Sequence, residues 1–232
     1  MCRRFALDLD WDTVAAWLDV DAGNVRRDRL PTPSYNIAPS STIGVVAQGR
    51  DGHRYLTGAH WSLIPRWSRS MTLPYPTYNA RCESAAHKPT FAESTASMRC
   101  IIPASGYYER QGKRPFYFHA PDGAPLAMAG LYSWWRASDA SPWRLTATVL
   151  TCAAVDGPAN VHDRMPLLVP SDMRSAWLDR TTDGGTLIEP LREAGTLISS
   201  ALRFHEVAPL PRDGDGRRLV APLDRTEPIR LF

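Results

Sequence analysis

The chain has 232 residues, 44% of them hydrophobic, which is enough to bury a sizeable core in one domain. No apolar run reaches the roughly 18 residues of a membrane span, and the N-terminus turns acidic too soon for a signal peptide, so we expect a soluble cytoplasmic protein. The net charge of +3 permits a polyanionic partner without requiring one. Only Lys88 and Lys113 of the 27 basic residues are lysine. This arginine excess suits phosphate binding but is equally typical of a GC-rich genome.

The pattern of hydrophobic and turn-forming residues along the chain predicts more strands than helices, with hairpins joining the strands. A strand at residues 3–7 precedes a helix at 12–18, for which Asp10 or Asp12 is the expected cap. Prolines hold residues 30–40 extended, and the turn at 49–52 joins strands at 43–48 and 53–61. Further strands are expected at 99–103, 116–119, 126–132 and 144–151, and helices near 90–97, 171–178 and 186–194.

The absence of a regular β-α-β alternation favours an α+β fold. We expect a single domain over residues 1–232, with a curled, mainly antiparallel β-sheet or open barrel flanked by a few helices. Residues 206–232 are rich in Pro, Arg and Gly, and we expect them to be loosely ordered.

The cysteines do not form a metal site by their spacing. Cys2, Cys82, Cys100 and Cys152 include no C-x-x-C pair, and the six histidines show no ligand spacing around them, so zinc is not expected. The last three cysteines lie in apolar or small-residue runs, and we expect buried free thiols there.

Cys2 is the most informative residue because it follows the initiator methionine. Removal of Met1 gives Cys2 an α-amine, with a pKa of about 7.7–8, beside a thiol with a pKa of about 8.5. A 1,2-aminothiol can condense with an aldehyde to close a thiazolidine ring, which an internal cysteine cannot do. The alternative is that Cys2 packs as a small hydrophobic residue.

Three polar segments carry further candidates. The Asn79 amide can orient an amine or an oxyanion, and Arg81 beside it can hold a phosphate. Glu109 follows Gly-Tyr-Tyr, and a carboxyl group in apolar surroundings is a usable general acid or base. His162 is a natural proton shuttle. For each, the alternative is a structural polar group that pairs locally.

A fourth segment, residues 61–67, contains two tryptophans. We expect Trp61 in the core, whereas an exposed Trp67 next to Arg66 suits stacking on an unpaired base.

Taken in order, short motifs resemble those of the SOS-response-associated peptidase (SRAP) family from residue 1 to about 180. These motifs are Met1-Cys2-x-Arg4-Phe5, Tyr35-Asn36-Ile-Ala-Pro39, Trp61-x-Leu-Ile-Pro-x-Trp67, Asn79-Ala-Arg81-x-Glu83, Arg99-Cys-x-x-Pro103, Gly106-Tyr-Tyr-Glu109 and His162-Asp-Arg-Met-Pro166.

The resemblance implies a sensor of abasic sites in single-stranded DNA that crosslinks to the lesion through an N-terminal thiazolidine. It makes Cys2 the nucleophile, with Asn79, Glu109 and His162 completing the active site. It also implies no metal or organic cofactor, no membrane partner, a monomer, and association with the nucleoid when DNA is bound. The DNA contacts implied are Arg81 and Arg164, with Arg4, Pro39, Trp67 and Thr151 as further contacts.

Four positions depart from the family pattern. Arg3 and Ser62 stand where Gly is usual, Ser34 where Arg is usual, and Arg110 where Trp is usual. Arg3 lies beside the nucleophile, where it can either crowd the site or add a phosphate contact. The chemistry should survive, because none of the four candidate catalytic residues is altered.

Two other function classes remain open at this stage. One is a cysteine peptidase or N-terminal-nucleophile hydrolase that uses Cys2 and removes Met1 by autoproteolysis. The other is a non-catalytic single-strand-binding module, which accounts for Trp67 and the arginines but not for Cys2.

Overall fold

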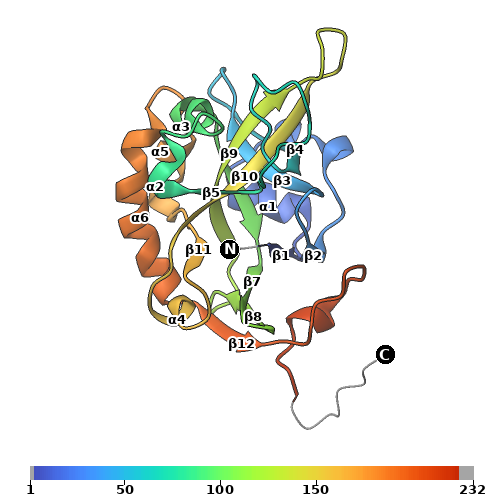
Figure 1. Ribbon diagram of the computed structural model, residues 1–232, viewed down its shortest axis with the longest axis vertical. Coiled ribbons are helices and arrows are strands. Elements are labelled where there is room, and N and C mark those ends of the chain that lie inside the picture. Colours follow the sequence, from blue (N-terminus) through green and yellow to red (C-terminus); the bar gives the residue numbers. More distant parts are fainter. Residues whose placement is uncertain (1–2, 225–232) are drawn as a thin grey trace.

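The computed structural model describes residues 3–224 and shows one α+β domain built on two sheets (Figure 1). Five strands form a barrel in the order β10-β4-β3-β6-β9, and β9 also pairs with β10, which closes the ladder. The predicted fold class is confirmed. The strands are β3 (Thr42–Gln48), β4 (Arg54–Trp61), β6 (Arg99–Ala104), β9 (Leu126–Trp135) and β10 (Arg144–Ala153).

The long strand β10 has two partners along each edge. On one edge it pairs with β9 through residues 144–149 and then with β11 (Arg164–Pro166) through residues 151–153. On the other edge it pairs in parallel with β4 and then with β5 (Asn79–Arg81). The end of β10 therefore brings β5 and β11 together, although they are more than 80 positions apart in sequence.

The second sheet is antiparallel, in the order β12-β8-β7-β1-β2. Only Ser105 separates β6 from β7, and its backbone N–H donates to the carbonyl of Ala6, so the chain passes directly from the barrel into this sheet. Its strands are β1 (Arg4–Leu7), β2 (Ser34–Ile37), β7 (Gly106–Gln111), β8 (Arg114–His119) and β12 (Arg203–Glu206).

The helices lie outside the sheets, and α2, α3, α5 and α6 gather on one side (Figure 1). Asp10 caps α1 by accepting from Thr13 N–H, which selects the first of the two predicted caps. The bounds are α1 (Trp11–Trp17), α2 (Cys82–Ala85), α3 (Ala92–Ser97), α4 (Asp156–Ala159), α5 (Arg174–Leu178) and α6 (Gly184–Ser200).

Arg99, the first residue of a family-like motif, has a structural role. Its side chain is buried and donates to backbone carbonyls at the ends of α3 and α5, among them Ala96 at 2.6 Å and Trp177 at 2.8 Å. A buried guanidinium is costly without such acceptors. Arg99 thus holds these two helices against the barrel.

The predicted strands at 43–48, 53–61, 99–103, 116–119, 126–132 and 144–151 are all confirmed, most of them extended by a few residues. The structure adds β5, β7, β11 and β12, which were not predicted, and β2 lies within residues 30–40, which were predicted only to be extended. Trp61 is buried, and the thiols of Cys82, Cys100 and Cys152 are free and buried, as expected. Among the described residues, no helix is long and apolar enough to cross a membrane.

In the C-terminal segment predicted to be loosely ordered, residues 206–224 make specific contacts with β2. The Asp215 carboxylate accepts from Tyr35 N–H at 2.8 Å, and the carbonyl of Gly214 accepts from the Asn36 amide at 2.7 Å. A short 3-10 helix at Arg217–Val220 buries Leu219. These few specific contacts could not be predicted from the amino-acid composition of the segment. Residues 225–232 lie outside the described part of the chain, as does Cys2.

Candidate active site

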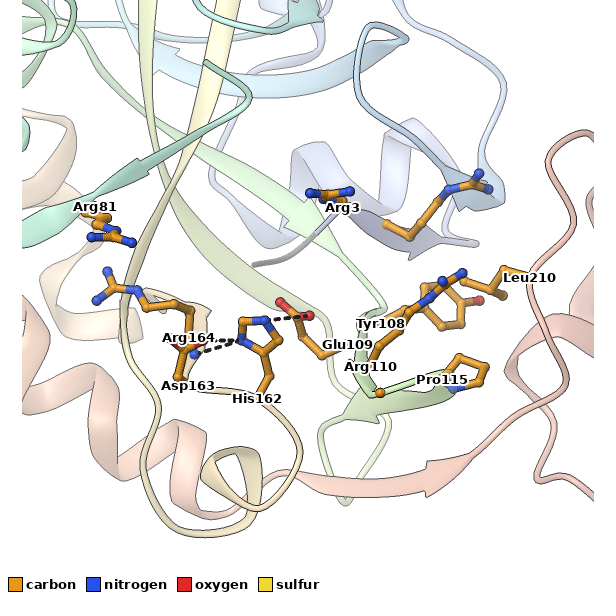
Figure 2. Close-up of a pocket in the computed structure, with 12 residues that line it drawn as sticks. Arg3, Arg81, Tyr108, Glu109, Arg110, Pro115, His162, Asp163, Arg164 and Leu210 are labelled. Carbon is orange, nitrogen blue, oxygen red and sulfur yellow. Dashed lines mark hydrogen bonds and ion pairs between the residues drawn. The ribbon is translucent and has the colours of Figure 1, made fainter. Parts of the chain in front are cut away.

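A pocket of ≈ 720 Å³ opens where β5, β7 and β11 meet the start of β1 (Figure 2). Its lining combines a carboxyl group and an imidazole with several arginines. The lining residues that matter here are Arg3, Arg4, Arg81, Glu109, Arg110, His162, Asp163 and Arg164.

Glu109 is the buried acid of this pocket. It lies on β7, and its side chain is only 7% exposed. Burial raises its pKa, because the carboxylate loses hydration, and a charged His162 nearby opposes that rise. A carboxyl group with a raised pKa keeps its proton to higher pH than an exposed one does, which favours a role as a general acid or base.

His162 faces Glu109 across the pocket (Figure 2), with Nε2 4.0 Å from Oε2. Its Nδ1 accepts from the backbone N–H of Arg164 at 3.0 Å and lies 2.8 Å from the Asp163 carboxylate. The first contact requires a bare Nδ1 and the second a protonated one, so they are alternatives.

Arg164 is fixed by a bidentate ion pair. Its two terminal nitrogens lie 2.7 and 2.9 Å from the Glu83 carboxylate, and one also donates to the Thr151 carbonyl at 2.6 Å. The Arg164 side chain is 11% exposed. This paired fork geometry sets the position of the guanidinium at the pocket wall.

Arg81 is the exposed counterpart of Arg164. β5 pairs with β10 so that Arg81 lies opposite Thr151, and Figure 2 shows its guanidinium beside that of Arg164. Asn79 lies two residues earlier on the same strand and therefore shares a face with Arg81. Its Oδ1 is buried.

The remaining residues predicted to contact DNA differ in how exposed they are. Arg4 lines the pocket and donates to Asn36 Oδ1 and to the carbonyl of Pro211. Trp67 is 58% exposed, and Pro39 is half-buried. Thr151 is completely buried, and its hydroxyl donates to the Ala80 carbonyl, so in this conformation it cannot touch DNA.

Sequence reasoning missed two contributors to the site. Glu83 was quoted only as part of a motif, yet it is the residue that holds Arg164. Leu210 lines the pocket from the C-terminal segment, where no pattern predicted structure. The spacing Asn-Ala-Arg-x-Glu offered a signal for Glu83, whereas Leu210 had none.

The other described cysteines do not compete as nucleophiles. Burial raises the pKa of Cys82 to about 12 and that of Cys152 to about 11, and it also raises the pKa of Cys100. All three thiols therefore stay protonated near neutral pH. Within residues 3–224, no cluster of His, Cys, Asp and Glu has the makings of a metal site.

The pocket therefore combines a buried carboxyl group that faces an imidazole with several arginines. The family to which such a site belongs follows from comparison with known proteins. The chain matches the SOS response associated peptidase (SRAP) family model over residues 1–210 and belongs to that family.

Curated relatives carry a common description. Abasic site processing protein YoaM of Bacillus subtilis is 33% identical over 184 residues, covering 77% of this chain and 79% of its own. Abasic site processing protein YedK of Escherichia coli is 28% identical over 215 residues, covering 90% and 92%. Abasic site processing protein HMCES of Xenopus tropicalis is 27% identical over 212 residues, covering 75% and 62%.

Solved structures share the fold. A protein from Bacteroides thetaiotaomicron superposes with a TM-score of 0.77 at 21% identity, covering 96% of this chain and 100% of that one. A protein from Bordetella bronchiseptica gives a TM-score of 0.70 at 25% identity, covering 89% and 99%. Both likenesses extend over nearly the whole described fold.

Proposed function

We propose that this protein captures abasic sites in single-stranded DNA, forming a thiazolidine between Cys2 and the ring-opened sugar. The family and the names of the curated relatives support abasic-site processing. The observation that carries the proposal is the buried Glu109 facing His162 beneath a rim of arginines. Arg3 lines the same pocket, and in the sequence it directly follows Cys2.

The chemistry balances without a metal or an organic cofactor. The Cys2 amine attacks the C1′ aldehyde to give a carbinolamine, which loses water to form a Schiff base. The Cys2 thiol then adds to the imine carbon, and its proton passes to the imine nitrogen. One water leaves in all, and both the C–N and the C–S bond remain in the ring.

Each catalytic residue has a distinct task in this scheme. Glu109 takes a proton from the attacking amine and returns it to the departing hydroxyl, which its raised pKa suits. His162 protonates the sugar oxygen as the ring opens. Asn79 holds the amine in attack geometry through its amide, where positioning alone can supply several kcal/mol.

The strand is held by charge and stacking around the pocket. Arg81 and Arg164 contact the flanking phosphates, Arg4 adds a further contact, and Trp67 and Pro39 wedge against neighbouring bases. Thr151 contributes indirectly, because its buried carbonyl fixes Arg164. We propose that the protein acts as a monomer in the cytoplasm, bound to the nucleoid, which is where single-stranded gaps arise.

The rival proposal is a peptidase or N-terminal-nucleophile hydrolase. Both the crosslinking proposal and the hydrolase proposal begin with removal of Met1, which can occur by autoproteolysis. Only a peptidase or hydrolase would go on to cleave other peptides. A single experiment separates them. Mature protein is incubated with abasic single-stranded DNA, with the undamaged strand and with a generic peptide.

We expect a heat-stable adduct with abasic DNA alone, which needs no borohydride. Intact mass of the free protein should be one methionine lighter than encoded. Cys2→Ala should abolish the adduct, whereas Cys2→Ser retains an amine and should give a slower or reversible one. Peptide hydrolysis without a DNA adduct would favour the rival reading.

A further inference from the structure

A second pocket, of ≈ 570 Å³, lies at the opposite end of the barrel from the strands β7, β8 and β12. Its lining residues come mainly from α3, the β3–β4 turn and the β9–β10 hairpin. These elements lie in the upper part of Figure 1. It shares no lining residue with the active-site pocket. We call it the Trp–Arg pocket, after its lining residues Arg50, Arg66, Glu93, Trp134, Trp143 and Arg180.

The two tryptophans of this pocket are unusually exposed. Trp134, near the end of β9, is 36% exposed, and Trp143, just before β10, is 47% exposed. The five other tryptophans apart from Trp67 are buried or half-buried. Two large apolar side chains beside one cavity are a common mark of a binding surface.

The pocket is also positively charged. Arg50, Arg66 and Arg180 contribute three cations, and Glu93, which lies 3.5 Å from Arg66, contributes one anion. Arg66 lies 5.9 Å from the centre of the Trp143 ring, and Arg136, which is paired with Asp139 and adds no net charge, lies 4.6 Å from it. Arginines held against an aromatic ring keep N–H groups available for phosphate oxygens.

The loop at residues 62–78 connects this pocket to the active site. Trp135 Nε1 donates to the Ser68 carbonyl at 2.8 Å, and Arg144 contacts the Met71 sulfur at 3.3 Å, so the loop lies along the β9–β10 hairpin. Arg66 and the exposed Trp67 are on it. The loop then leads directly into β5, which carries Asn79 and Arg81.

We propose that the Trp–Arg pocket is a second single-strand-binding subsite, which holds nucleotides of the DNA strand away from the lesion. Its cations neutralise phosphates, and its exposed tryptophans stack on unpaired bases, a combination that tolerates any sequence. The identity of the strand rests on the proposed function, but the subsite itself requires only single-stranded DNA. Its effect is to raise affinity for strands long enough to span both pockets.

The test compares two lengths of single-stranded DNA, each carrying one abasic site at an end. The short oligonucleotide has about 4 nucleotides and the long one about 16, which span the range of single-strand site sizes. The variants are Trp143→Ala, Trp143→Phe and Arg50→Ala, all in exposed turns. Arg29→Ala, an exposed arginine in the turn at residues 27–29 and outside both pockets, is the matched control.

We expect Trp143→Ala to weaken binding of the long strand by about fivefold or more, the effect of losing one stacked base, and Trp143→Phe to restore most of it. Arg50→Ala should lower the slope of log affinity against log salt by about 0.7, whereas Arg29→Ala should leave it unchanged. Crosslinking to the short oligonucleotide should be normal throughout.

Two outcomes overturn the proposal without touching the proposed function. One is long-strand affinity equal to wild type in both Trp143→Ala and Arg50→Ala. The other is an equal loss for short and long strands, which would place these residues at the lesion. Failure of the wild-type protein to crosslink the short oligonucleotide would instead contradict the covalent chemistry and leave the long-strand comparison valid on undamaged DNA.

Discussion

The two pockets are both lined by arginine, yet they differ in what lies beneath the arginines. The active-site pocket holds a carboxyl group that is 7% exposed, facing an imidazole, whereas the Trp–Arg pocket holds two tryptophans exposed by a third or more. In the first pocket, burial raises the pKa of the Glu109 carboxyl group, which suits it to proton transfer. In the second, the tryptophan side chains are partly exposed, which suits them to contact with bases. The two pockets are therefore both positively charged but suited to different functions, proton transfer in one and base stacking in the other.

The substitution Glu109→Gln tests the difference between the two pockets most strongly. It keeps the shape of the side chain but removes its ability to take up and release a proton. We expect crosslinking to slow by about 10²–10⁴-fold, while binding to undamaged single strands stays near wild type. If binding falls as far as crosslinking does, Glu109 is not acting as an acid or base.

The same variant, Glu109→Gln, should also change how the stability of the folded protein depends on pH. Since burial raises the pKa of Glu109 in the folded protein, its contribution to stability is present below the unfolded pKa of about 4.3 and is lost as pH rises through the folded value. Glu109→Gln does not suffer that loss. The melting temperature of the variant should therefore rise relative to that of the wild type as pH increases toward neutrality.

The next effect separates two of the arginines that line the active-site pocket, Arg164 and Arg81. Arg164→Ala removes a bidentate partner from Glu83 and a donor from the Thr151 carbonyl, so we expect a loss of about 1–3 kcal/mol in unfolding free energy. Arg81→Ala should change stability by less than about 0.5 kcal/mol and lower the salt slope of single-strand binding by about 0.7. Equal stability losses in the two variants would contradict the distinction between anchored and exposed arginine.

The smallest expected effect concerns Arg3, which lines the active-site pocket and follows Cys2 in the sequence. A cation beside the Cys2 amine and thiol favours their deprotonated forms. Arg3→Gly should therefore move the pH–rate profile of crosslinking upward by about half a unit and slow the reaction about threefold at neutral pH. A faster reaction with an unmoved profile would show that Arg3 only crowds the site.

The barrel strands could be predicted because they are long and apolar, and the hairpin at residues 49–52 has an unmistakable turn. β5 and β11 could not, because three residues are too few to show a period, and only their pairing with β10 makes them strands. β7 was also missed as a strand, since Gly, Glu and Arg interrupt its pattern. These short or irregular strands are the ones that position the site.

The candidate site residues were found through motifs rather than through periodicity. The structure brings Glu109, His162, Arg81, Arg164 and Arg4 to one pocket, as the motif order suggested. It also shows what a motif cannot, namely that Thr151 is buried and that Glu83 anchors Arg164. The Trp–Arg pocket lies outside every motif quoted except for Arg66, so only the fold reveals it.

The most direct test of the central claim is to map the DNA-linked residue by mass spectrometry after incubation with abasic single-stranded DNA. The account predicts an N-terminal peptide that starts at Cys2 and carries the sugar with loss of one water, formed without reductant. It also predicts that the same peptide stays unmodified with undamaged DNA. An adduct on any other residue, or one that appears only after borohydride reduction, would contradict it.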